Sequence, residues 1–456
     1  MARVIKIKKG LDINLKGKPR KVTKNNISSE YYSVFPDDYT GFVPKAAVKE
    51  GDKVLAGSPV FFDKNRPDIK IVSPVSGEIV AVNRGEKRKL INVVVKADSL
   101  IEYKKFGEKD VKNLSPESIK LALAEAGIFA FVKQRPYDII ANPKDTPRDI
   151  FVSGFYSTPL ASDFEYILKG EEENFQTGLD ALAKISGGDV YLSVRPNVQS
   201  SALKHAKGVK MVEVDGLHPA GNAGVQINHI KPVNKGETVW TVNPQDVIVI
   251  GRFFNKGIVD LTRLISFVGS EVNENARAYY PMILGAEIKE LIKGNTTQSD
   301  DLRYISGNVL TGIQIPRDGS LHAFDNQITV IPEGERTHEF VGWICPGFDK
   351  FSVSKTYPSF LVEALTKKEY TIDARLRGGR RAMIMSNEWD NVFPMDILPE
   401  FLIRAIIAFD IDKMENLGIY EVAPEDFALC EFVDTSKMEL QFIVRQGLDL
   451  LYKEMN

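Results

Sequence analysis

The stretch VKEGDKVLAGSPVFFDKNRPDIKIVSPVSGEIVAVNRG, from Val48 to Gly85, decides how the first part of this chain folds. Two short apolar runs, Pro59–Phe62 and Ile69–Val72, lie on either side of a polar turn. The segments EGD at 50–52 and SGE at 76–78 signal tight turns, because glycine adopts positive φ at low cost. β-Branched and aromatic residues fill the runs between these turns, as half-buried strands require. We therefore predict a sandwich of short antiparallel strands.

The same stretch resembles the lipoyl- and biotinyl-carrier family, in which GD marks one turn and PxSG the next. In that family the modified lysine lies at the tip of the central hairpin, and Lys64 falls there in this chain. One interpretation makes Lys64 the attachment point of a covalent cargo. The other makes the tip a solvated turn on a scaffold without cargo, and the longer turn with Pro67 favours this second interpretation.

Length, charge and cysteine content narrow the class of protein. The 456 residues are enough for two to four domains with cores of their own. Lys and Arg total 59 and Asp and Glu total 61, so the chain has no net positive charge that would favour binding to nucleic acid. The only cysteines, Cys345 and Cys430, exclude a disulfide framework and a cysteine-ligated metal centre held by this chain alone. We expect a reducing compartment and no membrane span, because no run approaches the roughly 18 apolar residues that a span requires.

We predict an α/β and α+β multidomain protein with four regions. Residues 1–105 would form a lead-in with a short strand at Arg3–Ile7, followed by the carrier-like β-sandwich. Residues 106–257 would form a Rossmann-like domain with a parallel sheet. Residues 258–345 would form a β-grasp module of the SLBB-like type, and residues 346–456 a connecting segment with C-terminal helices.

The Rossmann-like prediction rests on alternating helix and strand signals. The helix expected after Ser115-Pro116-Glu117 has serine as N-cap and proline in its first turn. A second helix is expected at Asn174–Ile185, with leucines and an isoleucine on one face. Continuous apolar runs, which favour buried parallel strands, occur at Asp149–Ser153, Val190–Val194, Val209–Val214 and Val247–Ile250.

The alternation of helix and strand signals changes after Leu261. A strand at Arg263–Val268, a helix at Ala286–Lys293 and a strand and turn around Arg303–Leu310 suggest a β-grasp module. More strands are expected in the segment that ends at Val330 and at Phe340–Ile344. Helices are expected at Pro399–Phe409, Asp412–Leu417, Pro424–Phe432 and Glu439–Tyr452.

A nucleotide would bind where the first strand of the Rossmann-like sheet turns into a helix. That turn is GFYSTP at 154–159, with one glycine and with bulky Phe155, Tyr156 and Pro159 in the path of a pyrophosphate. We therefore expect no bound dinucleotide or flavin. The five histidines show no HxxxH or HExxH spacing, and no nucleophile–base set can be picked out. We assign neither a metal site nor a catalytic residue to this chain.

Three segments could bind a ligand or a partner. His218 lies in the glycine-rich turn GLHPAGNAG and either binds a carbonyl or an anion, or packs one domain on the next. Arg377, Arg380 and Arg381 surround two glycines and form either an anion or partner site, or a solvated loop. The segment FVKQRPY at 131–137 offers rings and cations that suit a quinone, or it is a plain interdomain linker.

The chain as a whole resembles the A subunit of the Na+-translocating NADH:quinone reductases. The matching motifs, in the family's order, are IKKGLD at 7–12, NRGEKR at 83–88, HPAG at 218–221, PVN at 232–234, QDVI at 245–248, ISGNVLTG at 305–312, GW at 342–343, PG at 346–347, RAM at 381–383 and EDFALC at 425–430. Each motif is weak alone, but their shared order over the whole chain is specific.

This resemblance implies a peripheral subunit on the cytoplasmic side of a bacterial inner membrane, docked on a membrane-embedded partner. The complex would pass electrons from NADH to ubiquinone or menaquinone and couple this to Na+ export. Flavins and iron–sulfur centres would lie on other subunits, and the isolated chain would have no redox activity. Phe131, Lys133, Arg135 and Pro136 match a family segment and are the predicted quinone contacts.

The chain departs from the family pattern after Cys430, where Asp434 stands in place of an expected second cysteine. A redox or ligand role for Cys430 is therefore in doubt. Two rival functions stay open: a carrier or flavin-binding electron-transfer protein that acts alone, and a purely structural dock without quinone contact.

Overall fold

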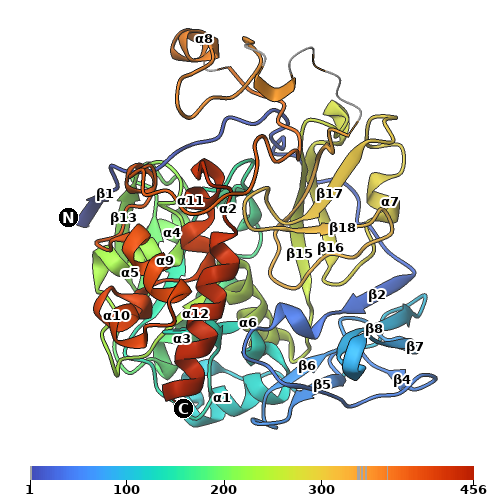
Figure 1. Cartoon of the computed structure of the whole chain (residues 1–456). Coiled ribbons are helices and arrows are strands. Elements are labelled where there is room, and N and C mark those ends of the chain that lie inside the picture. The colour runs from blue at the N-terminus through green and yellow to red at the C-terminus, as the bar shows by residue number, and fades with distance from the viewer. Residues whose placement is uncertain (1–2, 336–338, 340–341, 345–346, 367, 456) are drawn as a thin grey trace.

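A computed structural model describes residues 1–456 apart from 1–2, 336–338, 340–341, 345–346, 367 and 456. Within the described residues the strands form four sheets of seven, five, four and three strands. The mixed α/β multidomain prediction is confirmed. Figure 1 shows the β-sandwich in blue beside the yellow SLBB-like sheet, with the green sheet and the red C-terminal helices on the other side.

Two small antiparallel sheets form the predicted sandwich. The four-stranded sheet has the order β2-β8-β7-β4 and the three-stranded sheet the order β3-β5-β6. Their bounds are β2 Tyr31–Val34, β3 Pro44–Ala46, β4 Lys53–Val54, β5 Pro59–Asp63, β6 Lys70–Val72, β7 Gly77–Arg84 and β8 Leu90–Ala97. Lys64 is exposed on the turn after β5, whereas Asp63 is buried and pairs with Arg66 at 3.0 Å.

The seven-stranded sheet is the Rossmann-like core. Its order is β1-β13-β12-β11-β14-β9-β10, with the first five strands parallel and the last two antiparallel. The bounds are β1 Arg3–Lys6, β9 Val132–Arg135, β10 Ile139–Ile140, β11 Ile150–Ser153, β12 Val190–Val194, β13 Lys210–Asp215 and β14 Val239–Val242. The short strand predicted at the start of the chain thus joins this sheet as an edge strand.

Helices cover this sheet on both sides. They are α1 Pro116–Glu125, α2 Phe164–Ile167, α3 Glu172–Ile185, α4 Ser201–Lys204, α5 Ala223–Ile230 and α6 Pro244–Lys256. The Ser115 hydroxyl caps α1 by accepting from the Ser118 N–H at 3.2 Å, as predicted.

The predicted strand run Val247–Ile250 is wrong, because these residues lie in α6. Asn243 caps this helix and Pro244 opens it, and the run is buried because α6 packs closely on α3. Gly178 and Gly251 permit that contact: a Cβ at Gly178 would lie 2.1 Å from the Val247 oxygen, and one at Gly251 only 1.7 Å from the Asn174 oxygen. A helix buried on all faces and a buried parallel strand show the same apolar run.

The five-stranded sheet is the SLBB-like module. Its order is β16-β15-β19-β17-β18, and β15 and β19 are parallel neighbours, as in a β-grasp arrangement. The bounds are β15 Thr262–Val268, β16 Ala278–Ile283, β17 Leu302–Ser306, β18 Ile313–Ile315 and β19 Gln327–Pro332.

Two predictions in this region need correction. The helix predicted at Ala286–Lys293 is only α7 Lys289–Ile292, because Ala286 and Glu287 form β-bridges to Tyr32 and Ser320. The strand predicted at Phe340–Ile344 is also wrong for 342–344, which form a 3-10 turn that begins at Gly342, where φ is 66°. Phe340 and Cys345 lie outside the described residues.

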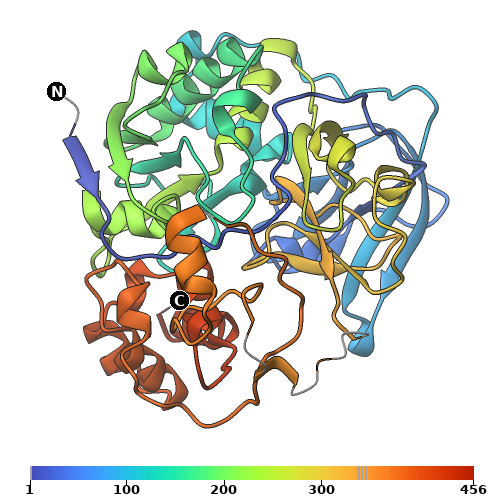
Figure 2. The same cartoon turned by 90° about the horizontal axis from the view of Figure 1, so that it is seen from above.

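The C-terminal region is helical, as predicted. Its helices are α8 Ser359–Thr366, α9 Pro399–Ile407, α10 Ile411–Asn416, α11 Ala428–Val433 and α12 Leu440–Met455. The start of the expected helix Pro424–Phe432 is instead a 3-10 turn, Pro424–Phe427, in which the Asp426 carboxylate accepts from the Ala423 N–H at 2.9 Å. Figure 2 shows the red and dark orange helices of this region gathered at one corner of the molecule, away from the blue sandwich.

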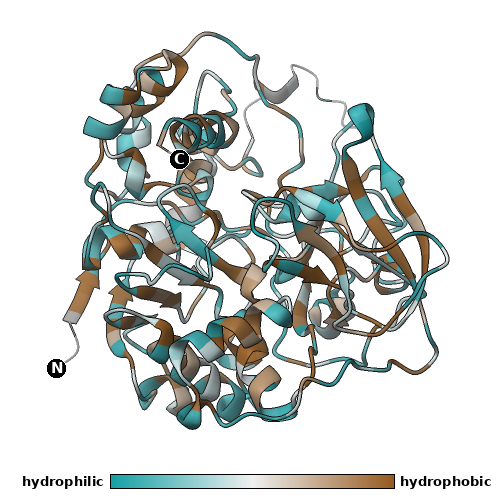
Figure 3. Cartoon of the chain, turned by 90° about the horizontal axis from the view of Figure 1, so that it is seen from below, coloured by the Kyte–Doolittle hydropathy of each residue, from teal (hydrophilic) through white to brown (hydrophobic). Residues whose placement is uncertain are grey.

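The C-terminal helices share a core with the edge of the seven-stranded sheet. Ile5 of β1 and Val214 of β13 belong to the same buried cluster as Leu402, Leu448 and Cys430. Figure 3 shows brown, hydrophobic segments on the strands and inner helices and teal in many connecting loops. In contrast, α8 stands apart from the main body in Figure 1.

Candidate functional site

A cavity of about 240 Å³ lies where the seven-stranded sheet, the SLBB-like module and the C-terminal region meet. It is lined by residues that directly follow β11 and β14, such as Tyr156 and Asn243. These two neighbouring strands lie where the sheet order reverses, since β12 follows on one side of β11 and β14 on the other. Ligands of open α/β sheets bind at such a switch point, beyond the carboxyl ends of the strands.

Aromatic rings and one lysine form part of the cavity wall. Phe131 and Phe324 pack edge to face with ring centres 5.7 Å apart, and Tyr39 packs edge to face on both from behind. The Lys133 ammonium group lies 4.6 Å from the centre of the Phe324 ring and 4.0 Å from Asp138. This wall offers a flat apolar surface and a hydrogen-bond donor side by side.

Amides and a phenol form a second part of the wall. The Tyr156 hydroxyl donates to Asn243 Oδ1 at 2.9 Å and accepts from Asn326 Nδ2 at 3.0 Å. Gln245 Nε2 donates to Asn326 Oδ1 at 3.0 Å. Burial raises the pKa of Tyr156 above its usual range, so the phenol stays protonated. The network fixes these side chains across two domains.

A buried ion pair stands behind the aromatic wall. Arg263 of β15 pairs with Asp246 of α6, and both side chains are 1% exposed. The Arg263 guanidinium also lies 5.4 Å from the Phe131 ring centre. Burial raises the pKa of Asp246 to about 6, against the opposing charge of Arg263. The second oxygen of Asp246 is buried without a hydrogen-bond partner among the described residues, on a side chain that lines the cavity.

Arg135 closes the side of the cavity toward the C-terminal region. It donates to Asp426 and to Glu425, both at 3.2 Å, and lies 3.9 Å from Asp138. Its side chain is 1% exposed. Burial, and then the Asp426 charge, raise the pKa of Glu425. The guanidinium thus joins β9 to the turn before α11.

His218 also reaches the cavity, in a position that keeps it neutral. Its Nδ1 lies 3.0 Å from the Ser157 hydroxyl, which in turn accepts from the Gly221 N–H at 2.8 Å. The Ser157 hydroxyl therefore links the imidazole to the backbone of the glycine-rich turn. His218 is 2% exposed, and burial lowers its pKa to about 4. Its backbone N–H donates to Asp12 at 2.9 Å, so the turn also ties the N-terminal segment down.

Asp325 enters the cavity from the SLBB-like module. It accepts from the Ser306 hydroxyl at 2.6 Å. Its other oxygen lies against Gly307, where a Cβ would be only 2.5 Å away, so no larger residue fits at 307 without movement. Burial raises the pKa of Asp325 to about 6.

The structure brings only part of the predicted sites together. Phe131, Lys133 and Arg135 line one cavity with His218, whereas Pro136 is buried and is not among the lining residues. Sequence reasoning missed Phe324, Asp325 and Asn326. The motif ISGNVLTG, which supplies Gly307 and Asn308 to the lining, was the nearest signal for them.

The three arginines of the basic segment do not converge. Arg377 pairs with Asp373 at 3.4 Å, while Arg380 is exposed and pairs with Glu439 at 2.5 Å. Arg381 is exposed, and its backbone N–H donates to the Ser436 oxygen at 3.0 Å. Their predicted role toward an anion or a partner stays a prediction.

Cys430 is fully buried, and burial raises the pKa of its thiol well above the usual range. Asp434, at the place of the expected second cysteine, is buried and accepts from the Met438 N–H at 2.8 Å. Over the described residues, no three His, Cys, Asp or Glu side chains gather as a metal ion would require. None of the helices described combines the length and the apolar character that crossing a bilayer demands.

Family models match most of the chain. They are the NqrA N-terminal barrel-sandwich hybrid domain at residues 5–98, the NqrA second alpha/beta domain at 114–259 and the NQRA C-terminal domain at 264–316. A solved structure of an NAD+-reducing nickel–iron hydrogenase aligns with 50% of this chain and 48% of its own, at 14% identity and a TM-score of 0.35. That likeness is too weak to carry an argument.

Curated relatives match over almost the whole length. The A subunit of the Na(+)-translocating NADH-quinone reductase of Neisseria meningitidis serogroup A is 36% identical over 454 residues, which is 99% of this chain and 100% of the relative. The same subunit of Rhodopirellula baltica is 36% identical over 99% and 98% of the two chains, and that of Pasteurella multocida 34% over 99% and 100%. The chain therefore belongs to the NqrA family, the A subunits of the Na+-translocating NADH-quinone reductases.

Proposed function

We propose that this subunit binds the head group of the quinone substrate in the cavity at the switch point. The observation that carries the proposal is the meeting of Phe131 and Lys133 with Phe324 in one cavity. A quinone is a flat ring with an oxygen at each end. The two phenylalanines offer a face for the ring, and Lys133 offers a donor for one oxygen.

The opposite oxygen finds donors within the same cavity. The amide nitrogens of Asn243 and Asn326 belong to side chains in its lining, whereas the Tyr156 proton is already donated to Asn243. The unpartnered oxygen of Asp246 marks a polar position that a ligand or a water molecule would occupy. Since pockets for drug-sized ligands span roughly 300–1,000 Å³, a cavity of about 240 Å³ suits a single ring system and leaves an isoprenoid tail outside.

Arg135 takes a positioning role in this proposal. Its guanidinium is held by Asp426 and Glu425, so it fixes the wall rather than offering a free donor. Pro136 follows directly after β9, is buried, and contributes shape alone.

The protein would dock on a membrane-embedded partner in the same complex, on the cytoplasmic face, and the complex would hold its flavins and iron–sulfur centres elsewhere. Exposed apolar side chains support a protein partner: Leu361 and Leu365 on α8 are 56% and 87% exposed, and Phe409 after α9 is 70% exposed. The bulky Phe155 and Tyr156 after β11 argue against a flavin phosphate at that turn.

Photo-crosslinking tests the quinone site. The assembled complex is labelled with azido analogues of ubiquinone and of menaquinone, and labelled peptides are mapped. We expect labels on segments 131–138 and 322–327, and at least a fivefold loss of labelling in Phe324→Ala and Lys133→Met. Phe442→Ala, which removes an exposed ring that does not line the cavity, is the matched control. Labels only on other subunits would favour the purely structural role.

A further inference from the structure

Asp325 is a carboxyl group at the cavity without a cation in direct contact. Among the described residues, Asp246 pairs with Arg263 and Glu425 with Arg135, but no ammonium or guanidinium group is within salt-bridge distance of Asp325. Its contacts are the Ser306 hydroxyl and the Gly307 backbone. Burial favours the protonated form of this carboxyl, while the hydrogen bond from Ser306 favours the charged form.

A second pair of titratable groups stands directly behind Asp325. His322 begins the same turn, since the Asp325 N–H donates to the His322 oxygen at 3.3 Å. The His322 Nδ1 lies 2.6 Å from Asp38 Oδ1, and the other oxygen of Asp38 accepts from the Ala323 N–H at 2.8 Å. The imidazole stacks on Phe35 with ring centres 4.3 Å apart. This pair joins the β-sandwich to the SLBB-like module.

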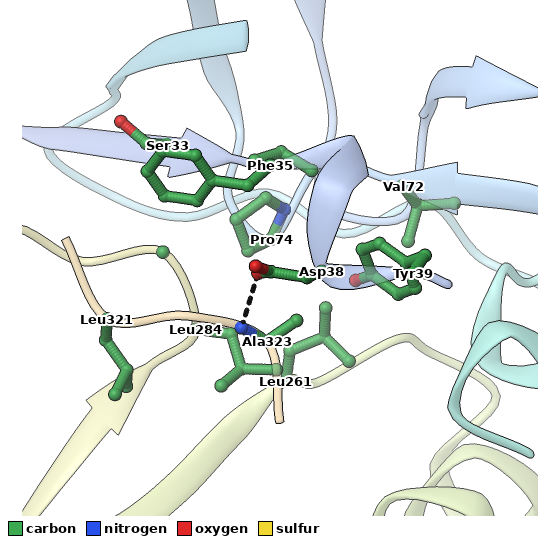
Figure 4. Close-up of a pocket in the computed structure, with 12 residues that line it drawn as sticks. Ser33, Phe35, Asp38, Tyr39, Val72, Pro74, Leu261, Leu284, Leu321 and Ala323 are labelled. Atoms are coloured by element: carbon green, nitrogen blue, oxygen red, sulfur yellow. Dashed lines mark hydrogen bonds between the residues drawn. The ribbon is translucent and has the colours of Figure 1, made fainter. Parts of the chain in front are cut away.

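Asp38 in turn lines a second, smaller pocket. Figure 4 shows Asp38 and Ala323 together with Phe35, Tyr39 and Pro74 around this pocket. Its volume of about 20 Å³ is enough for one water molecule. Asp38 thus lines the pocket and contacts His322, and His322 and Asp325 are joined through the backbone of one turn.

We propose that Asp325 gives the quinone in this cavity the protons that accompany its reduction, and that the His322–Asp38 pair returns a proton to Asp325. The inference rests on the proposed quinone site. It adds to that site a proton donor and a route by which the donor is restored from solvent.

The proton and electron balance closes. NADH, oxidised to NAD+ elsewhere in the complex, supplies two electrons to the quinone. At each quinone oxygen an O–H bond forms as the O–H bond of Asp325 breaks, and the quinone leaves as quinol. After each transfer the Asp325 carboxylate takes a proton from the His322 imidazolium, which takes one from water at the Asp38 pocket. The sum is NADH + H+ + quinone giving NAD+ + quinol, with the protein unchanged.

The electrostatic surroundings agree with these roles. Burial raises the pKa of Asp325 to about 6, and the charges of His322 and Arg263 oppose this while that of Asp38 supports it. Lys133 of β9 and Asp246 of α6 face the same cavity. For His322, burial lowers the pKa, but the hydrogen bond to Asp38 outweighs it and raises the pKa. Asp325 therefore changes protonation near pH 6, and His322 holds its proton more readily than a free imidazole does.

The test compares quinone reduction by the complex with Asp325→Asn, Asp325→Glu and His322→Gln across pH 5 to 9. Because the donor must carry a proton, the wild-type rate should fall as pH rises above about 6. Asp325→Asn should lower the rate by about 100-fold and abolish the fall in rate above pH 6. Asp325→Glu should restore much of the rate and of its pH dependence. His322→Gln should lower the rate by about tenfold and enlarge the solvent deuterium isotope effect. The exposed Asp318→Asn is the control and should change neither.

The readouts separate the two proposals. If Asp325→Asn changes neither the labelling by the quinone analogue nor the pH profile of the rate, the donor role is overturned. The proposed quinone site is then unaffected. Labelling that maps elsewhere in the wild type overturns the quinone site itself. If Asp325→Asn does not assemble, His322→Gln decides: an unaltered rate and isotope effect in that variant overturn the proton route.

Discussion

Two acidic clusters border the cavity, and they differ in what neutralises them. On the C-terminal side, Asp426 and Glu425 face the buried guanidinium of Arg135. On the SLBB-like side, Asp325 faces a hydroxyl and a glycine, with a histidine–aspartate pair behind it. An arginine does not release its proton, so Arg135 can hold the domains together but cannot itself pass protons. The second cluster consists of carboxyl groups and an imidazole, which can release and take up protons.

The largest expected effect comes from removing the arginine of the first cluster. Arg135→Ala leaves Asp426 buried without its counter-charge and should cost about 3–5 kcal/mol of unfolding free energy. Urea unfolding of the purified protein measures this. Arg380→Ala, which breaks the exposed pair with Glu439, is the control and should cost at most about 1 kcal/mol. Equal losses in the two variants would show that the Arg135 cluster does not hold the domains together.

The second prediction uses the two histidines near the cavity, whose pKa values shift in opposite directions. For His218 the folded-state pKa of about 4 lies below the unfolded value of 6.5, so the unfolded chain binds more protons between these values. Stability is therefore lost as pH falls from 6.5 to 4, by about 3 kcal/mol in full. His218→Gln should flatten that loss in unfolding experiments at pH 4.5 and 7.5.

His322 should give the opposite slope. Its folded-state pKa is raised by Asp38, so its contribution is present below pH 6.5 and is lost as pH rises through the folded value. His322→Gln should reduce stability at pH 6 more than at pH 8.5. The same pH dependence for both histidine variants would contradict the difference between the two sides of the cavity.

Only part of the fold and of the residues around the cavity could be predicted from the sequence. The N-cap Ser115 and the order of the domains followed from local signals. Phe131 and Lys133 were predicted as quinone contacts because rings and cations stand within one short segment, and both line the cavity. Phe324 and Asp325 come from a turn almost two hundred residues later, so no local pattern could join them to Lys133. The α6 run was misjudged because burial on all faces removes the periodicity that tells a helix from a strand.

A smaller effect is expected at the glycine beside Asp325. Gly307→Ala adds a Cβ 2.5 Å from the Asp325 carboxylate at a φ of 94°, and should cost about 1–3 kcal/mol. Gly236→Ala is the matched control, because φ is 82° there and nothing lies within 4 Å of the added Cβ. The difference between the two variants isolates the contact with Asp325 from backbone strain. No difference in thermal unfolding would mean that this contact is absent.

The smallest effect is expected at the other lysine that the sequence singled out. Lys64 is exposed on a turn, whereas Lys133 packs over an aromatic ring at the cavity. Lys64→Arg should leave both the stability and the quinone reduction of the complex unchanged. Intact mass spectrometry of the native protein should give the mass of the bare chain, and an added mass at Lys64 would revive the carrier interpretation.

The pairing of β1 with β13 has a consequence for synthesis of the protein. Arg3 is made long before its partner, Val212. The leading segment must therefore remain unpaired while the whole sandwich and most of the central sheet are made. Contacts of such long sequence separation form late and slowly. The C-terminal helices, which share a core with Ile5, can complete their packing only after this first strand has closed the sheet.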